Sequence, residues 1–222
     1  MLSPVLDFAD ARNRMVDSQV RPNKVTDPRI LTAMRRLPRE RFLPPALVSL
    51  AYSDTDVPLG GGRVLLEPMV IARLIQAASP RPGERALVVA SGAGYGAAVL
   101  SACGPAVTAL EEDAALLALA RPVLADFAPG VVLVTGKLAD GWAAGEPWDI
   151  ILIEGGVKAV PPAIGAQLRR DGGRLVTVLA GPGRTGQAVL GELTPAGLRM
   201  QPVFDCTAAL LPSLLPAPGF VF

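Results

Sequence analysis

The sequence contains no histidine and only two cysteines among its 222 residues, and these absences exclude several classes of chemistry. Without histidine there is no imidazole base, no serine–histidine–aspartate triad and no histidine metal ligand. Cys103 and Cys206 lie far apart among apolar neighbours, so we expect them to pack as small hydrophobic side chains. We therefore expect neither a disulfide nor a metal site, and acid–base chemistry would have to use carboxylates or lysines with shifted pKa values.

An excess of one charge and long apolar runs are also missing. The 21 basic and 20 acidic residues leave a net charge of +1, which argues against nucleic acid or an anionic membrane as the partner. No apolar run approaches the roughly 18 residues that a membrane span requires. Four charged residues within residues 1–15 argue against a signal peptide. We expect a cytoplasmic protein that binds neither nucleic acid nor membranes.

What is present is the composition of a globular domain, because half of the residues are hydrophobic and only 18% are charged. The length fits one domain spanning residues 1–222. Ser3 before a proline predicts the N-cap of a first helix that runs to about Gln19, and further helices are expected at residues 29–37 and 69–78. We expect residues 1–80 to form a helical extension that carries a substrate loop, ahead of an α/β core at residues 81–222.

From residue 85 onward, apolar strands alternate with helices. Strands are expected at residues 85–89, 106–110, 131–135, 149–154 and 173–179, with a helix around residues 162–169 before the last of them. Continuous apolar strands of this kind indicate a parallel sheet that is covered on both faces. The connection at 181–186 is too short for a crossover helix, so a strand at 187–193 should return antiparallel before a last strand at 198–204. The predicted fold is a doubly wound, mostly parallel, Rossmann-like α/β sheet with antiparallel C-terminal strands.

A glycine-rich turn follows the first of these strands, within Ala90, Ser91, Gly92, Gly94 and Tyr95. Such a turn presents backbone N–H groups and a positive helix end to a nucleotide-like ligand. A tight turn with no ligand is the alternative. The spacing of the glycines also matches a relaxed dinucleotide pattern, which keeps a nicotinamide-dependent oxidoreductase open, although the sequence shows no recognisable catalytic pair for it.

Ionisable residues follow the ends of the other strands. Glu111 ends the second strand, where a carboxylate can accept hydrogen bonds from both ribose hydroxyls of a nucleoside. Alternatively, Glu111 and Glu112 only complement the dipole of the next helix. Lys137 and Leu138 follow the third strand and could cover an adenine edge. Glu154 ends the fourth strand, where it would face either the active cleft or solvent.

Several segments, taken in their shared order and spacing, resemble the protein-L-isoaspartate O-methyltransferase family. The resemblance covers residues 15–178, and it identifies the chain as a member of that family. The matching segments, each followed by the family pattern, are MVDSQVR at 15–21 (MVxxQLR), DPRILTAM at 27–34 (DPRVLxAM), LPRERFLP at 37–44 (VPRERFVP), GYGAAVL at 94–100 (GYQAAVL), GW at 141–142 with PWD at 147–149 (GW…PFD), and PPAI at 161–164 with residues 168–176 (IPxALxxQLxxGGRLV).

This resemblance implies a methyltransferase fold and S-adenosylmethionine as cofactor, bound at residues 90–94 and at Glu111 and the neighbouring positions named above. It implies methylation of a carboxylate in a peptide or protein, which is a protein-repair activity when the carboxylate belongs to isoaspartate. The accepting carboxylate is its own nucleophile, so the lack of histidine does not disfavour this reaction. The reaction needs positioning and partial desolvation of the acceptor.

The chain departs from the family pattern at functional positions. The family's GQTISQP loop appears as GRVLLEP at 62–68, so the serine that contacts the substrate carboxylate becomes Leu66, which cannot hydrogen-bond. Arg63 and the amides of the three glycines at 60–62 are candidates for holding an anion instead, and Glu67 completes the altered loop. These glycines predict a flexible loop that lies against a ligand, or a plain connector.

Further departures lie in the cofactor motifs. The family's VLEIGTGSGY appears as ALVVASGAGY, so its acidic residue becomes Val88 and its first glycine becomes Ala90. The family's GDG becomes Gly136, Lys137 and Leu138, which reverses the sign of one charge. These changes leave an alternative to the enzyme: a non-catalytic or re-purposed binding module on the same fold.

Overall fold

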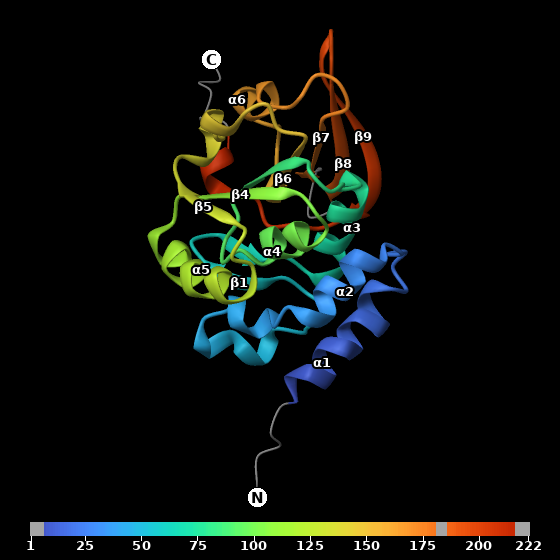
Figure 1. Ribbon diagram of the computed structural model, residues 1–222, viewed down its shortest axis with the longest axis vertical. Coiled ribbons are helices and arrows are strands. Elements are labelled where there is room, and N and C mark those ends of the chain that lie inside the picture. The colour runs from blue at the N-terminus through green and yellow to red at the C-terminus, as the bar shows by residue number, and fades with distance from the viewer. Residues whose placement is uncertain (1–6, 181–185, 216–222) are drawn as a thin grey trace, which may run out of the picture.

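The computed structural model describes residues 7–180 and 186–215, and at its centre lies a seven-stranded sheet in the order β5-β4-β3-β6-β7-β8-β9 (Figure 1). A separate two-stranded sheet pairs β1 with β2. The strands are β1 Val57–Gly60, β2 Arg63–Leu65, β3 Arg85–Val89, β4 Ala106–Glu111, β5 Val132–Thr135, β6 Ile150–Val157, β7 Arg174–Ala180, β8 Gly186–Thr194 and β9 Gly197–Cys206.

The central strands are parallel and the last two pairings are antiparallel. Parallel pairs join β3 to β4, β3 to β6, β4 to β5 and β6 to β7. The pairs of β7 with β8 and of β8 with β9 are antiparallel. This confirms the predicted fold class. The chain order reverses between β3 and β6, and in open α/β sheets the ligand site lies at the carboxyl ends of the strands beside such a reversal.

Both faces of the central strands β3, β6 and β7 are buried, as the continuous apolar strands predict, whereas the edge strands β5 and β9 are largely half-buried or exposed. Along β3, Ala86 and Val88 belong to one hydrophobic cluster, whereas Leu87 and Val89 belong to the other. The first cluster includes side chains from α1 to α5, and the second includes side chains from α6 and the C-terminal segment. The helices are α1 Phe8–Met15, α2 Pro28–Arg36, α3 Pro68–Ala78, α4 Tyr95–Ala102, α5 Ala114–Phe127 and α6 Pro162–Ala166.

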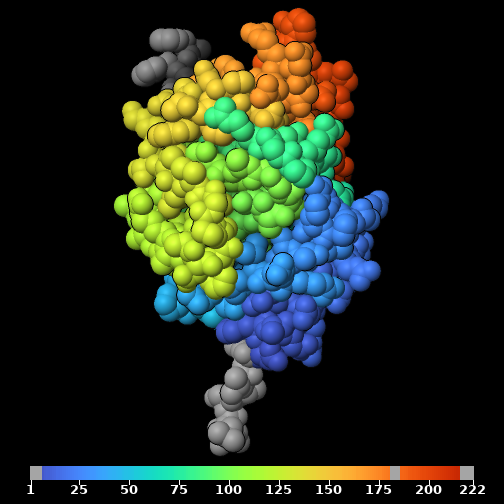
Figure 2. Space-filling model, viewed as in Figure 1, coloured from blue at the N-terminus to red at the C-terminus, as the bar shows by residue number. Residues whose placement is uncertain are grey.

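Caps and prolines set the helix boundaries in the first part of the chain. The expected cap at Ser3 lies outside the described residues, and α1 has Asp7 as its N-cap, which accepts hydrogen bonds from two backbone N–H groups. The helical path then continues as a π-helical turn, Val16–Val20. α2 and α3 both begin at a proline, as predicted. The blue segment that carries α1 and α2 covers the lower part of the molecule (Figure 2).

Three expectations about local structure are corrected. Residues 57–65 form a hairpin rather than a flexible loop, and its glycines 60–62 all have positive φ, at 95°, 57° and 76°. Strand β6 does not end at Glu154 but continues to Val157, because after a register shift Gly156 and Val157 pair with β7. Gly156 also exchanges backbone hydrogen bonds with Ala209 and Leu211 of the C-terminal segment. Helix α6 ends at Ala166, earlier than the expected residue 169.

No helix within residues 7–180 and 186–215 is long and apolar enough to cross a membrane.

Candidate functional site

The glycine turn, residues 90–94, joins β3 to α4 at the carboxyl edge of the sheet. Ala90, Gly92 and Gly94 have positive φ values of 62°, 58° and 93°. The Ser91 N–H donates to the carbonyl of Leu110 in β4, and this bond ties the turn to the neighbouring strand. The left-handed backbone is costly for an alanine, so Ala90 stores strain where the family pattern has glycine.

Glu111 lies beside this turn, where the sequence predicted it. It is the last residue of β4 and is fully buried. Its Oε2 accepts a hydrogen bond from the Gly92 N–H at 2.7 Å, and its Oε1 accepts from the N–H groups of Glu112 and Asp113 at 2.9 and 3.0 Å. Three backbone donors therefore fix the carboxylate beside the glycine turn, at the place where the sequence predicts a ribose.

An arginine from the hairpin pairs with this carboxylate. Arg63 Nη1 lies 2.8 Å from Glu111 Oε1, and Arg63 Nη2 lies 2.9 Å from Oε2. Nη2 also donates to the carbonyl of Ala90 at 2.6 Å. Both side chains are buried, at 7% and 0% exposure. The sequence predicts Arg63 on a substrate loop but holds no signal of its contact with Glu111, because that contact depends on the hairpin.

Glu154 reaches the same region from β6. Its carboxyl lies against the backbone of Gly96 in α4, where an added Cβ would overlap Glu154 Oε1. Burial raises the pKa of Glu154 to about 8, with a further rise from the Glu111 charge, while Arg63 and Arg39 act in the opposite direction. The family pattern has glutamine at position 96, so Glu154 occupies space that a glutamine side chain would need.

The substrate-loop positions divide between the core and the surface. Leu66 is 3% exposed and packs in the main hydrophobic cluster. Its carbonyl accepts a hydrogen bond from Nη2 of Arg39, at 2.5 Å. Glu67 precedes α3, and burial raises its pKa, as do the charges of Asp54 and Asp56. The Leu66 side chain therefore offers only apolar contacts, while its backbone carbonyl holds Arg39.

Arg39 is a buried charged residue near the candidate site, and the sequence pattern did not predict its burial. It is fully buried, donates from Nε to the carbonyl of Ala51 at 2.8 Å and lies over the ring of Tyr95, 4.7 Å from its centroid. Tyr95, predicted as a cofactor-binding residue, is 1% exposed and packs edge-on against Phe42, with ring centroids 5.3 Å apart. Arg39 lies in the segment at residues 37–44 that matches a family pattern, and that match is the one sequence signal for its structural importance.

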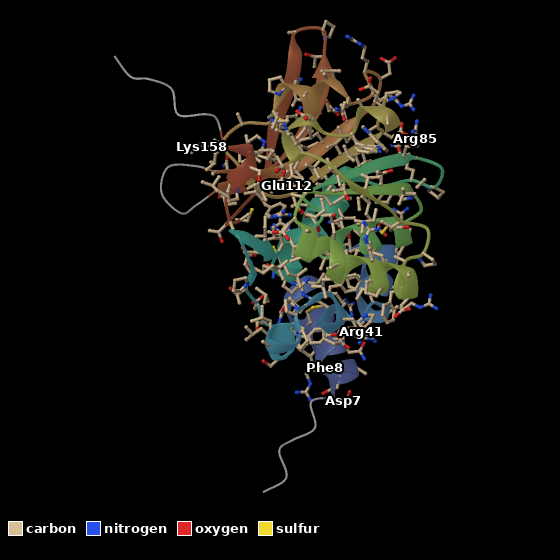
Figure 3. All side chains as sticks on the ribbon, turned by 90° about the vertical axis from the view of Figure 1, so that its left-hand side faces the viewer. Asp7, Phe8, Arg41, Arg85, Glu112 and Lys158 are labelled. Carbon is tan, nitrogen blue, oxygen red and sulfur yellow. The ribbon has the colours of Figure 1, made fainter. Side chains whose placement is uncertain are left out.

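The C-terminal segment, residues 208–215, closes over this edge, and nothing in the sequence indicated that it would. The Ser213 hydroxyl donates to Glu112, whose carboxylate also accepts from the Leu138 N–H at 3.3 Å. Leu211 and Leu214 join Leu138 in the second hydrophobic cluster. In Figure 3, Glu112 and Lys158 lie toward the carboxyl ends of the parallel strands, whereas Arg85, the first residue of β3, lies toward their amino ends.

Lys137 is the predicted site residue that the structure does not bring into this cluster. It is exposed, and no hydrogen bond or ion pair joins its side chain to another part of the chain that the structure describes. The neighbouring Leu138, in contrast, is buried, at 1% exposure.

The carboxyl edge fits a nucleoside cofactor in its polar groups. Glu111 offers a fixed carboxylate beside Gly92, and the Leu59 side chain of the hairpin lies against that glycine, 3.6 Å from where a Cβ would be. The Ser91 hydroxyl is buried and has no hydrogen-bond partner in the described parts of the chain, so its hydrogen-bonding capacity there is unused. Arg63 is the one group that a ribose would have to replace at Glu111.

Comparisons with known proteins agree with this reading of the fold. The family model of protein-L-isoaspartate(D-aspartate) O-methyltransferase matches residues 10–190. A protein-L-isoaspartate O-methyltransferase of Methylorubrum extorquens (strain PA1) is 42% identical over 194 residues, which cover 87% of this chain and 83% of the relative. One from Koribacter versatilis is 37% identical over 176 residues and covers 79% of each chain.

Solved structures with less than 25% identity share the fold. A protein-L-isoaspartate O-methyltransferase aligns with a TM-score of 0.76 at 23% identity, covering 93% of this chain and 67% of that one. The corresponding Plasmodium falciparum protein, in complex with S-adenosyl-L-homocysteine, aligns with a TM-score of 0.72 at 17% identity and covers 91% of this chain and 98% of its own.

Proposed function

This chain belongs to the protein-L-isoaspartate(D-aspartate) O-methyltransferase family, and from that premise we propose that it transfers a methyl group from S-adenosylmethionine to a carboxylate of a peptide or protein. The observation that carries the proposal is the buried carboxylate of Glu111, which the Gly92 N–H fixes beside the glycine turn. The relatives bear the name of an enzyme, which favours this function over a non-catalytic binding module.

The proposed chemistry suits a chain without histidine. The bound cofactor supplies a methyl group whose S–C bond breaks as a C–O bond forms, which turns the sulfonium into a thioether and the carboxylate into an ester. No proton moves in this step, so the chain needs no general base. The work of the protein is to hold both reactants in line and to keep water away from them.

We propose separate residue sets for the two reactants. The substrate set lies in the hairpin and the residues after it, and consists of Arg63, Leu66 and Glu67. The cofactor set surrounds the glycine turn and the carboxyl ends of the neighbouring strands, and consists of Ala90, Ser91, Gly92, Gly94, Tyr95, Glu111, Glu112, Lys137, Leu138 and Glu154. We also propose that the protein acts in the cytoplasm, as one domain of 222 residues, in the repair of isoaspartyl proteins.

The test is transfer of a labelled methyl group from S-adenosylmethionine to a peptide containing isoaspartate, beside the same peptide with normal aspartate. We expect labelling of the isoaspartyl peptide and a loss of at least about tenfold in the Glu111→Gln variant, because a charged hydrogen-bond acceptor is lost. Glu192→Gln, at an exposed residue of β8, is the matched control and should retain the rate.

A folded wild-type protein that labels neither peptide would contradict the proposed function. A Glu111→Gln variant that labels the isoaspartyl peptide as fast as the wild type does would contradict the role of Glu111 in cofactor binding.

A further inference from the structure

We infer that Arg63 exchanges partners during the reaction: it binds Glu111 while the cofactor is absent, and it binds the acceptor's carboxylate once a ribose has taken Glu111. The inference rests on the proposed function and adds to it an order of binding, with the cofactor first. It also assigns the acceptor-binding role to a guanidinium in place of the hydroxyl that is missing at Leu66.

The carboxylate of Glu111 already has all its hydrogen-bond acceptor positions filled. Its two oxygens accept five hydrogen bonds, two from Arg63 and one each from the N–H groups of Gly92, Glu112 and Asp113. A carboxylate has about four lone-pair positions, so no acceptor capacity is left for ribose hydroxyls. The backbone donors belong to β4 and the turns around it, which leaves Arg63 as the donor that must depart.

Arg63 lies on a hairpin that is separate from the central sheet. It begins β2, directly after the glycines 60–62, and β2 pairs with β1 alone. The positive φ values of these three glycines give the hairpin a turn whose backbone conformations are costly for other residues. The long arginine side chain can therefore change partner without movement of β3 or β4.

The Arg63 guanidinium needs a new partner once a ribose has displaced it from Glu111. A guanidinium that has lost its carboxylate in a buried site is unfavourable unless it finds another anion. The proposed reaction brings one, because the methyl acceptor is itself a carboxylate. The planar fork of arginine matches both oxygens of a carboxylate, whereas Leu66 can offer no hydrogen bond. The acceptor is therefore recognised as an anion, and its binding site forms only after cofactor binding.

The test combines calorimetric titration with S-adenosyl-L-homocysteine and fluorescence anisotropy of a labelled isoaspartyl peptide. Arg63→Gln introduces the residue of the family pattern, which cannot form the bidentate ion pair. We expect it to bind S-adenosyl-L-homocysteine about tenfold more tightly than the wild type, because no ion pair has to break. With S-adenosyl-L-homocysteine present, it should bind the peptide about tenfold more weakly.

The wild type itself should bind the peptide only when S-adenosyl-L-homocysteine is present. Arg199→Gln removes an exposed arginine of β9 and is the matched control, with both affinities unchanged. Arg63→Lys keeps the charge but loses the planar fork, so its affinities should lie between those of the wild type and Arg63→Gln. Circular dichroism of each variant checks that it is folded.

The inference is overturned if Arg63→Gln binds S-adenosyl-L-homocysteine no more tightly than the wild type, or if the wild type binds the peptide equally with and without it. In either case the proposed methyltransferase function still stands, provided that the wild type binds S-adenosyl-L-homocysteine. If neither the wild type nor Arg63→Gln binds it, the inference and the proposed function both fail.

Discussion

Gly96 and Glu154 form a contact whose energetic coupling can be worked out from the structure. A Cβ at position 96 would overlap Glu154 Oε1 and would lie 2.9 Å from Ile71 Cδ1. Gly96→Ala should therefore destabilise the protein by about 1–3 kcal/mol, the usual effect of overpacking a buried site. The helical preference of alanine over glycine offsets up to about 1 kcal/mol of this cost, because Gly96 lies within α4.

When Glu154 is truncated first, the same substitution meets only the end of the flexible Ile71 side chain. Gly96→Ala in a Glu154→Ala background should then lie within about 1 kcal/mol of neutral, so the double-mutant cycle gives a coupling of roughly 1–3 kcal/mol. The assay is urea unfolding of the four proteins. Equal effects of Gly96→Ala in the two backgrounds would refute the contact between these residues.

Three further perturbations have definite expected outcomes. Burial raises the pKa of Glu154 from 4.5 to about 8, so the folded protein binds a proton that the unfolded chain releases between these values. Stability should fall as the pH rises through that window, and thermal unfolding should show that Glu154→Gln removes part of the fall. Ala90→Gly should raise the stability by up to about 1 kcal/mol, because it relieves a φ of 62°; lower stability in urea would contradict the strain. Arg39→Ala should cost about 3 kcal/mol or more, since the carbonyls of Ala51 and Leu66 both lose a buried donor; a smaller effect in urea would show that these bonds are replaced.

Much of the fold could be predicted because it depends on local patterns. The apolar run of β3 and the glycines after it gave the strand, the turn and the start of α4 at their observed positions. Proline and aspartate placed the start of α2 in the same way. The hairpin at residues 57–65 was missed because its strands have only four and three residues and consecutive glycines favour a loop.

The candidate site was predictable only where neighbouring strands bring residues together. Glu111 lies beside Gly92 because β4 pairs in parallel with β3, and the sequence pattern had indicated parallel strands with these residues at their carboxyl ends. The contact of Arg63 with Glu111 spans 48 positions and depends on the unpredicted hairpin. The bond from Ser213 to Glu112 spans 101 positions, so local periodicity holds no information about it.

The most direct test of the account is a crystal structure of the protein with S-adenosyl-L-homocysteine. The account predicts the ribose hydroxyls within hydrogen-bond distance of Glu111, the glycine turn at residues 90–94 against the ligand, and the Arg63 guanidinium away from Glu111. A ligand bound elsewhere on the molecule, or bound at the turn with the Arg63–Glu111 ion pair intact, would contradict it.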